Sequence, residues 1–150
     1  MAIADSKTNK NIDQLNSFLR GERSAVEAYR KALGKIDDGP ISEQLQACME
    51  SHQKRVEALT ARIATLGGKP SETSGPWGAM TGAIADTAAI FSEKAAIAAL
   101  ESGEDHGLHD YQRDIPNLSV DLRGLVISEL LPAQEFTHAR MSELKRALRQ

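Results

Sequence analysis

The sequence is poor in aromatic side chains and in cysteine. Phe, Trp and Tyr make up 4% of its 150 residues, and Cys48 is the single cysteine. One cysteine cannot form a disulfide within the chain, and no Cys-x-x-Cys pair is present to bind a metal or carry electrons. These absences argue against a disulfide-rich secreted fold and favour a cytoplasmic location. They also mean that any redox reaction would need an external electron donor.

The chain also lacks a strong excess of one charge and any long hydrophobic run. Its formal net charge is −3 with both signs interspersed, so no basic face for nucleic acid is expected. The most apolar window, residues 77–91, contains Asp86 and falls short of the roughly 20 residues that span a membrane. No secretory signal, glycine-rich phosphate loop or nucleophile elbow is found. We therefore expect a soluble protein without nucleic-acid, membrane, nucleotide or acyl-transfer chemistry.

What the sequence has in abundance is helix-forming residues at helical spacing. Apolar side chains recur every three or four residues, as in helices that bury one narrow face, and no alternating run predicts a strand. We expect a flexible tail over residues 1–10 and a single domain over residues 11–150. Within that domain, the pattern predicts helices over about 11–36, 40–66, 77–90, 92–114 and 119–148.

Turn and capping residues separate the predicted helices. DDGP (37–40) and IPNLS (115–119) break the chain, and KPSETSGP (69–76) forms a loop. Ser92 is placed to cap the third main helix, and Pro132 to kink the last one. Two helices, a long crossover with a short helix, and two further helices are the connectivity of ferritin-like bundles. The predicted fold class is all-α, an antiparallel four-helix bundle.

An ionisable residue interrupts the apolar face near the middle of every main helix. Glu22 stands where a leucine is expected, between Leu19 and Val26. The other interruptions are His52, Glu104, Glu135 and His138. Because an unpaired carboxylate is costly to bury, these groups need partners.

Two kinds of partner satisfy this requirement, and the residues leave both open. One is a metal pair, because Glu135-Phe-Thr-His138 places a carboxylate and an imidazole one turn apart on a helix. Such ligands suit iron, manganese or zinc. The other is mutual ion pairing, with Arg55, one turn beyond His52, as the obvious cation.

Two internal repeats relate the halves of the chain. GERSAVEAY (21–29) and GEDHGLHDY (103–111) share Glu-x6-Tyr at an offset of 82 residues. SEQLQACMESH (42–52) and SELLPAQEFTH (128–138) share Ser-Glu-x-Leu-x-Ala and a final histidine at an offset of 86. The pattern indicates a doubled helical hairpin with approximate two-fold symmetry. We expect the tyrosine of each repeat to pack inside and to hydrogen-bond a nearby carboxylate.

With these motifs and the LGGKP segment (66–70), the chain resembles the ferritin-like superfamily in its rubrerythrin-like form. It is similar in particular to an uncharacterised bacterial branch, over about residues 11–148. The resemblance implies a di-metal site of iron or manganese, with a Glu on each of two helices and Glu-x-x-His on the other two. The implied ligands in this chain are Glu22, His52, Glu104, Glu135 and His138. The sixth implied ligand is a Glu at position 49, where this chain has Met49.

Two features put the implied metal site in question. One is Met49, and the other is the position of the implied ligands along the last helix. A thioether is a poor ligand for hard iron, so one carboxylate is missing. The predicted helix lengths also place the ligands of the last helix at a different depth from Glu104. A displaced turn or the kink at Pro132 must absorb this offset, or Glu129 rather than Glu135 faces Glu104.

Two functions of different class therefore stay open, and the residues do not decide whether the chain is an enzyme. The favoured one is a bundle with no metal or a degenerate metal site, acting as a binding, oligomerisation or stress-related module. The alternative is a di-metal carboxylate protein that reacts with oxygen or peroxide and needs an external redox partner. A homodimer is compatible with both.

Overall fold

The computed structural model describes residues 6–74 and 92–149, which form helices and no strand. The elements are α1 (Ser6–Leu33), α2 (Gly39–Thr65), α3 (Glu93–Asp114), the 3-10 turn η3 (Ile115–Asn117), α4 (Val120–Leu125), the π-helical turn η4 (Val126–Leu130) and α5 (Leu131–Ala147). Because α4, η4 and α5 are continuous, they make one long last helix. The predicted all-α four-helix bundle is confirmed, whereas the helix predicted over 77–90 lies outside the described residues.

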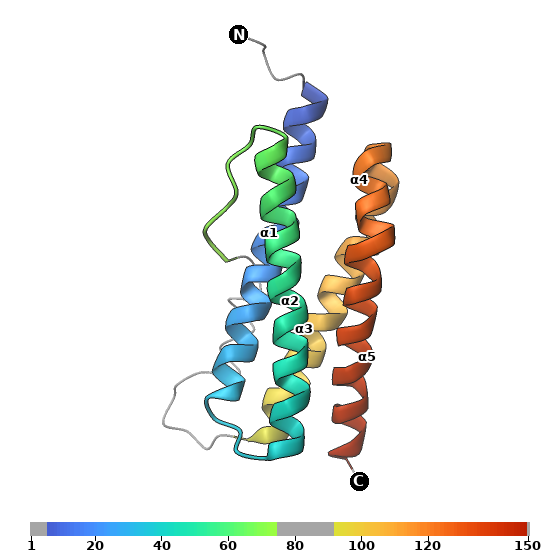
Figure 1. Cartoon of the computed structure of the whole chain (residues 1–150). Coiled ribbons are helices and arrows are strands. Elements are labelled where there is room, and N and C mark those ends of the chain that lie inside the picture. Colours follow the sequence, from blue (N-terminus) through green and yellow to red (C-terminus); the bar gives the residue numbers. More distant parts are fainter. Residues whose placement is uncertain (1–5, 75–91, 150) are drawn as a thin grey trace.

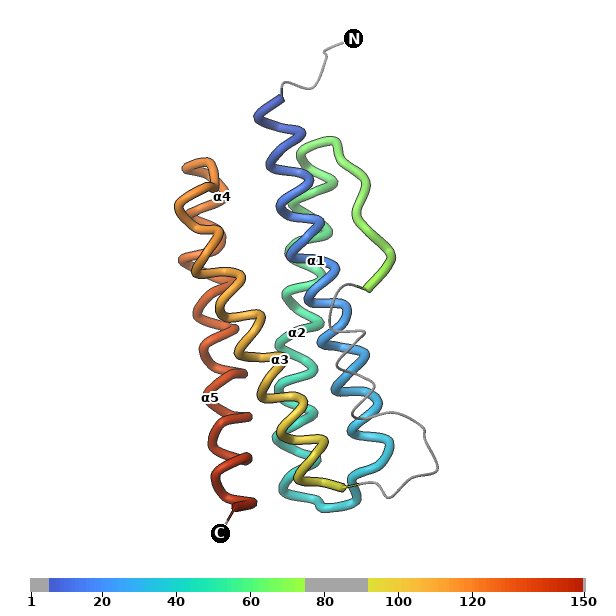
Figure 2. Tube along the Cα trace, turned by 180° about the vertical axis from the view of Figure 1, so that it is seen from behind, coloured from blue at the N-terminus to red at the C-terminus, as the bar shows by residue number. Residues whose placement is uncertain are grey.

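The bundle consists of two antiparallel helical pairs. α1 lies beside α2, and α3 lies beside α5 (Figures 1 and 2). α2 ends at the opposite end of the bundle from the start of α3, so a long crossover must join them (Figure 1). The first part of this crossover runs back along α1, where Asn16 and Arg23 donate to the carbonyls of Lys69 and Ser71. None of the described helices combines the length and apolar character that crossing a membrane requires.

Side-chain caps fix the helix starts near their predicted places. Ser92 accepts a hydrogen bond from the N–H of Ala95 at 3.2 Å, and Ser119 caps α4 in the same way. Asp38 caps α2, which carries a proline in its first turn. The start of α1 differs from the prediction, because the helix begins at Ser6 and the predicted tail is helical from there.

A layer of polar side chains at mid-height divides the hydrophobic core into two clusters. The cluster nearer the α1–α2 turn includes Leu45 and Met141, and the cluster toward the other end includes Leu15 and Leu130. The buried polar layer comprises Glu22, His52, Arg55, Glu104, Gln134 and Thr137, none more than 4% exposed. These residues lie near the middles of the four long helices, so the fold brings them to a common depth.

The last helix contains a register shift directly before Pro132. At η4 the N–H of Leu131 donates to the carbonyl of Val126, five residues back. A π turn inserts one residue relative to an α-helix and so rotates the next part of the helix by about 100°. Pro132 has no N–H to donate, so the altered ladder loses no bond at that position. Where the sequence predicted a kink, the structure has this inserted residue.

Candidate functional site

Glu22, His52 and Glu104 meet in the buried layer from α1, α2 and α3. Nδ1 of His52 lies 2.5 Å from Oε2 of Glu22, and its Nε2 lies 2.7 Å from Oε2 of Glu104. Because both ring nitrogens face carboxylates, the protonated imidazolium fits best, with one N–H donated to each acid. Of the five site residues predicted from the sequence, these three are brought together.

Arg55 supplies the second positive charge of the layer. Its Nη1 donates to Oε1 of Glu22 at 3.3 Å and also to the side-chain carbonyl of Gln134. Its Nη2 donates to Oγ1 of Thr137 and to Oγ of Ser51, both at 3.1 Å. The guanidinium therefore joins α2 to α1 and α5. Arg55, the candidate cation in one of the two alternatives left open by the sequence, therefore pairs with Glu22.

The tyrosines of the two Glu-x6-Tyr motifs bond across the halves of the chain. The hydroxyl of Tyr111 donates to Oε1 of Glu22 at 2.7 Å, and that of Tyr29 donates to Oε2 of Glu104. Within one helix, seven residues separate glutamate and tyrosine by about 10 Å along the axis, too far for a direct bond. Each tyrosine reaches the glutamate of the other motif instead. The predicted tyrosine–carboxylate bonds are therefore present, and each bond joins one copy of the repeated motif to the other.

Gln134 and Thr137 complete the layer from α5, and the sequence prediction missed both. Nε2 of Gln134 donates to Oε1 and to the backbone carbonyl of Glu104, both at 2.8 Å. Oγ1 of Thr137 donates to the same Oε1 at 2.7 Å. A signal for them was present, because residues 130, 134, 137 and 141 have good helical spacing. That face lies beside the predicted one and is polar at its centre.

Glu135 and His138 do not join the layer, contrary to the predicted geometry. Glu135 is exposed, and Nε2 of the half-buried His138 lies 3.4 Å from Oδ1 of Asp105. The π turn brings Gln134 and Thr137 to the core-facing positions of the last helix, and the residue after each of them points about 100° to one side. Glu129 is exposed as well, so neither glutamate faces Glu104.

The layer balances its own charges, with two carboxylates against a guanidinium and an imidazolium. Burial alone would raise the pKa of Glu22, but the charges of Arg55 and His52 lower it from 4.5 to about 2. Burial would also raise the pKa of Glu104, but the charge of His52 and its hydrogen bond lower that pKa below 4.5. Burial would lower the pKa of His52, yet Glu104 and Glu22 raise it above 6.5. The two carboxylates and the imidazole are therefore stabilised in their charged forms.

Met49 and Cys48 belong to the hydrophobic core and not to the polar layer. Met49 is partly buried and packs against the cluster near the α1–α2 turn. Burial, with the nearby Glu104 carboxylate, raises the pKa of the Cys48 thiol to about 12. A thiol with so high a pKa is a poor nucleophile, which supports its prediction as a small buried apolar group.

The donors in the layer do not fit a di-metal carboxylate centre. Such centres take carboxylates from all four helices and a histidine from two of them. Here α2 contributes a histidine and an arginine, and α5 contributes an amide and a hydroxyl. The carboxylates of Glu22 and Glu104 and both nitrogens of His52 already contact protein partners. Over residues 6–74 and 92–149, no group of three or more His, Cys, Asp or Glu side chains is arranged for a metal.

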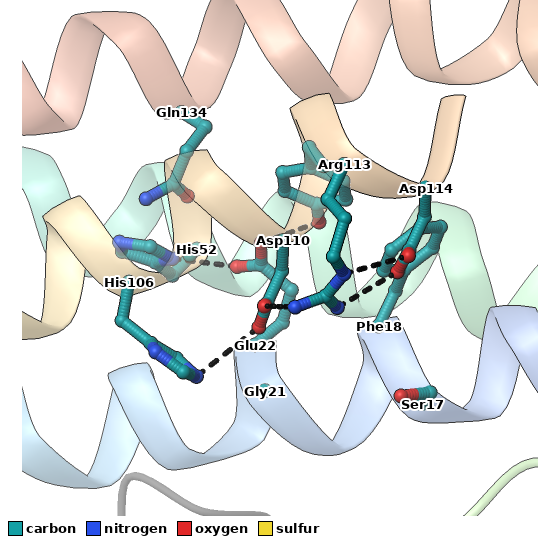
Figure 3. A pocket seen from close by; sticks show the side chains of 12 residues that line it. Ser17, Phe18, Gly21, Glu22, His52, His106, Asp110, Arg113, Asp114 and Gln134 are labelled. Carbon is teal, nitrogen blue, oxygen red and sulfur yellow. Dashed lines mark hydrogen bonds and ion pairs between the residues drawn. The ribbon is translucent and has the colours of Figure 1, made fainter. Parts of the chain in front are cut away.

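A small cavity of about 60 Å³ lies between α1 and α3 and reaches the edge of the layer (Figure 3). Glu22 and His52 line its inner part. Around it, Oδ1 of Asp110 accepts from Arg113 at 3.0 Å, and Oδ2 of Asp110 lies 3.2 Å from Nε2 of His106. The cavity therefore connects two buried polar side chains with a rim of charged residues.

The fold and the family are established by comparison with known proteins. The chain is similar to a crystal structure described as ferritin-like, diiron-carboxylate proteins from Bacillus anthracis str. Ames. The TM-score is 0.64 and the identity 17%, over 96% of each chain, so the likeness establishes a ferritin-like fold. No curated protein matches the chain. A family model described as a domain of unknown function, DUF2383, matches residues 10–116, well over half of the chain. The chain therefore belongs to the DUF2383 family, and it has the ferritin-like fold that its resemblance to an uncharacterised branch predicted.

Proposed function

We propose that the chain is a metal-independent ferritin-like bundle that serves as a binding or oligomerisation module. The polar layer then has a structural role, which is to fix the register of the four helices. The observation that carries this proposal is the guanidinium of Arg55, which is 3% exposed and bonded to Glu22, Gln134 and Thr137. A resident side chain thus provides the positive charge that the buried acids require.

The geometry of the layer supports a register-fixing role. Sliding one helix by a single turn, about 5.4 Å, would separate His52 from acids that now lie 2.5 and 2.7 Å away. The slipped state would leave buried charges unpaired, and breaking such a pair costs about 3–5 kcal/mol. The layer therefore favours one alignment of the helices over slipped ones, as a rigid module requires.

The alternative is a centre that binds iron or manganese and reacts with oxygen or peroxide. It is favoured by the meeting of Glu22, His52 and Glu104 and by the diiron-carboxylate description of the similar structure. In this alternative those three residues would hold the metal, which would supply the redox chemistry. Met49 and Gln134 stand on the helices that would have to provide the missing carboxylates.

Metal analysis of protein from cells supplied with iron and manganese separates the two proposals. A metal-independent bundle should contain well below one metal per chain and keep its thermal unfolding midpoint after chelator treatment. A content near two metals per chain, lost together with stability on chelation, would overturn it. Arg55→Met provides a second test, because it removes the cation that pairs with Glu22. The variant should take up more metal only if the buried carboxylates can converge on an ion. Arg62→Met, on the same helix outside the layer, is the matched control.

The oligomerisation part of the proposal rests on the outer face of the last helix. Val120, Ile127 and Phe136 are 80%, 51% and 46% exposed there. Large apolar side chains in water favour contact with another apolar surface, here a second copy. Sedimentation velocity should show a concentration-dependent dimer that Phe136→Ser weakens. A monomer at every concentration would refute this part without touching the metal question.

A further inference from the structure

Gly21 is a helix-interior glycine that packing does not require. A Cβ built at Gly21 would meet no heavy atom within 4 Å, although glycine destabilises a helix relative to alanine. Gly107, on α3, differs, because a Cβ there would lie 2.9 Å from Nε2 of Gln134. Both glycines line the cavity that reaches Glu22. The visible effect of Gly21 is therefore to keep this cavity open.

The donors around the rim of the cavity are turned toward carboxylates. Arg113 contacts Asp110 and Asp114, both at 3.0 Å, and His106 contacts Asp110 at 3.2 Å (Figure 3). The two aspartates and the arginine together carry a formal charge of −1. The rim thus favours a cation.

The inner wall offers acceptors as well. Nε2 of Gln134 gives its hydrogens to Glu104, and the hydroxyl of Tyr111 donates to Oε1 of Glu22. In the part of the chain that the structure describes, Oε2 of Glu22 accepts one hydrogen bond, from His52, so it has capacity for another. A ligand here must therefore bring its own hydrogens.

The aromatic lining suits a cation too. The rings of Phe18 and Tyr111 lie with centroids 4.7 Å apart, and both residues line the cavity. The faces of such rings attract ammonium groups. A space of about 60 Å³ admits a molecule of one or two heavy atoms, since water occupies about 30 Å³ in the liquid.

We propose that the cavity is a binding site for a small ammonium-type cation, ammonium itself or methylammonium. Its N–H groups donate to the carboxylates of Glu22 and Asp110, and Gly21 keeps the space in which it sits. The site adjoins the polar layer, and the inference goes beyond the proposed function without depending on it.

NMR of the full ¹⁵N-labelled chain tests this inference. Ammonium chloride is titrated at neutral pH, where ammonium is protonated, against potassium chloride at matched ionic strength. We expect saturable shifts of the Gly21 and Gly107 amides by ammonium or methylammonium and none by tetramethylammonium, which is too large. The dissociation constant should be roughly 10–100 mM, near the limit for so small a ligand.

Three variants make the test decisive. Gly21→Leu fills the cavity and should abolish the response. Gly124→Leu adds the same side chain at an exposed glycine where a Cβ also meets nothing, and should keep it. Asp110→Asn keeps the shape of the rim and should weaken binding several-fold. Equal shifts with potassium, a full response in folded Gly21→Leu, or unchanged affinity in Asp110→Asn would overturn the proposal.

Discussion

Tyr29 and Tyr111 each stabilise a carboxylate that belongs to the other half of the chain. A buried carboxylate keeps its charge when several donors surround it. Glu104 receives hydrogen bonds from Tyr29, Thr137 and Gln134, and contacts His52 as well. At the scale of single residues, the layer is therefore a set of specific bonds whose contributions can be separated by mutation.

Tyr29→Phe should lower the free energy of unfolding by about 1–3 kcal/mol, because it removes one donor from buried Glu104. In double-mutant cycles, Tyr29→Phe should couple strongly to Glu104→Gln and weakly to Glu22→Gln. Urea unfolding of the single and double variants measures both coupling energies. Equal coupling to the two acids would contradict the crossed arrangement.

Acid should destabilise the protein through Glu22. Its folded pKa is about 2, lowered from 4.5, so its contribution is complete above pH 4.5 and is lost as the pH falls toward 2. The free energy of unfolding should decrease by roughly 3 kcal/mol over this window, at about 1.4 kcal/mol per pKa unit. Urea unfolding across this pH range measures the loss. Glu22→Gln should be less stable at neutral pH and should lack this part of the pH dependence.

At the scale of the helices, most of the secondary structure could be predicted from local patterns. Periodic apolar residues indicated the long helices, and Ser92 and Ser119 marked two of their starts. The register of α5 could not be predicted in this way, because a π turn depends on the balance of packing on both sides of it. Periodicity alone could not tell the face containing Glu135 from the neighbouring face containing Gln134.

Deleting Ser128 from η4 should remove the inserted residue and restore a regular α-helix, in which α5 keeps its orientation relative to α4. Gln134 and Thr137 would then stay in the layer, so we expect unfolding to remain cooperative, with a thermal midpoint lowered only by the strain of Pro132 inside a regular helix. Ser128→Ala is the matched control, since it removes only a hydroxyl that donates to the carbonyl of Gly124 at 2.7 Å. Loss of cooperative unfolding in the deletion variant, but not in Ser128→Ala, would contradict the reading of the π turn as one inserted residue.

At the scale of the whole molecule, the polar layer is the link between two apolar clusters. Arg55→Met should cost about 3–5 kcal/mol, because it leaves the acids opposed by His52 alone. Amide hydrogen exchange should then accelerate in both clusters, on α1 and α5 alike. Arg62→Met should leave exchange nearly unchanged. Acceleration confined to one cluster would mean that the halves of the core are stabilised separately.

The sequence indicated which helices carry buried charge, because Glu22, His52 and Glu104 each interrupt an apolar face. It could not indicate which hydroxyl meets which acid, since that depends on how helices distant in the chain face each other. The sequence pointed to Arg55 as a cation for the buried acids, but it did not indicate the bonds of Arg55 to Gln134 and Thr137 on the last helix. Pairings across the bundle required coordinates.

The reciprocal contacts of Tyr29 and Tyr111 have a consequence for assembly. If the two helical hairpins changed places, the bond from Tyr29 would take the place of the bond from Tyr111, and the reverse. A two-fold axis relates the contacts of a symmetric dimer in the same way. A pair of identical hairpins could therefore form both bonds between separate molecules, each offering its hydroxyl to the acid of its neighbour. Within one chain the two hairpins can differ, and they do so at Arg55 and Met141, which occupy corresponding buried places 86 residues apart.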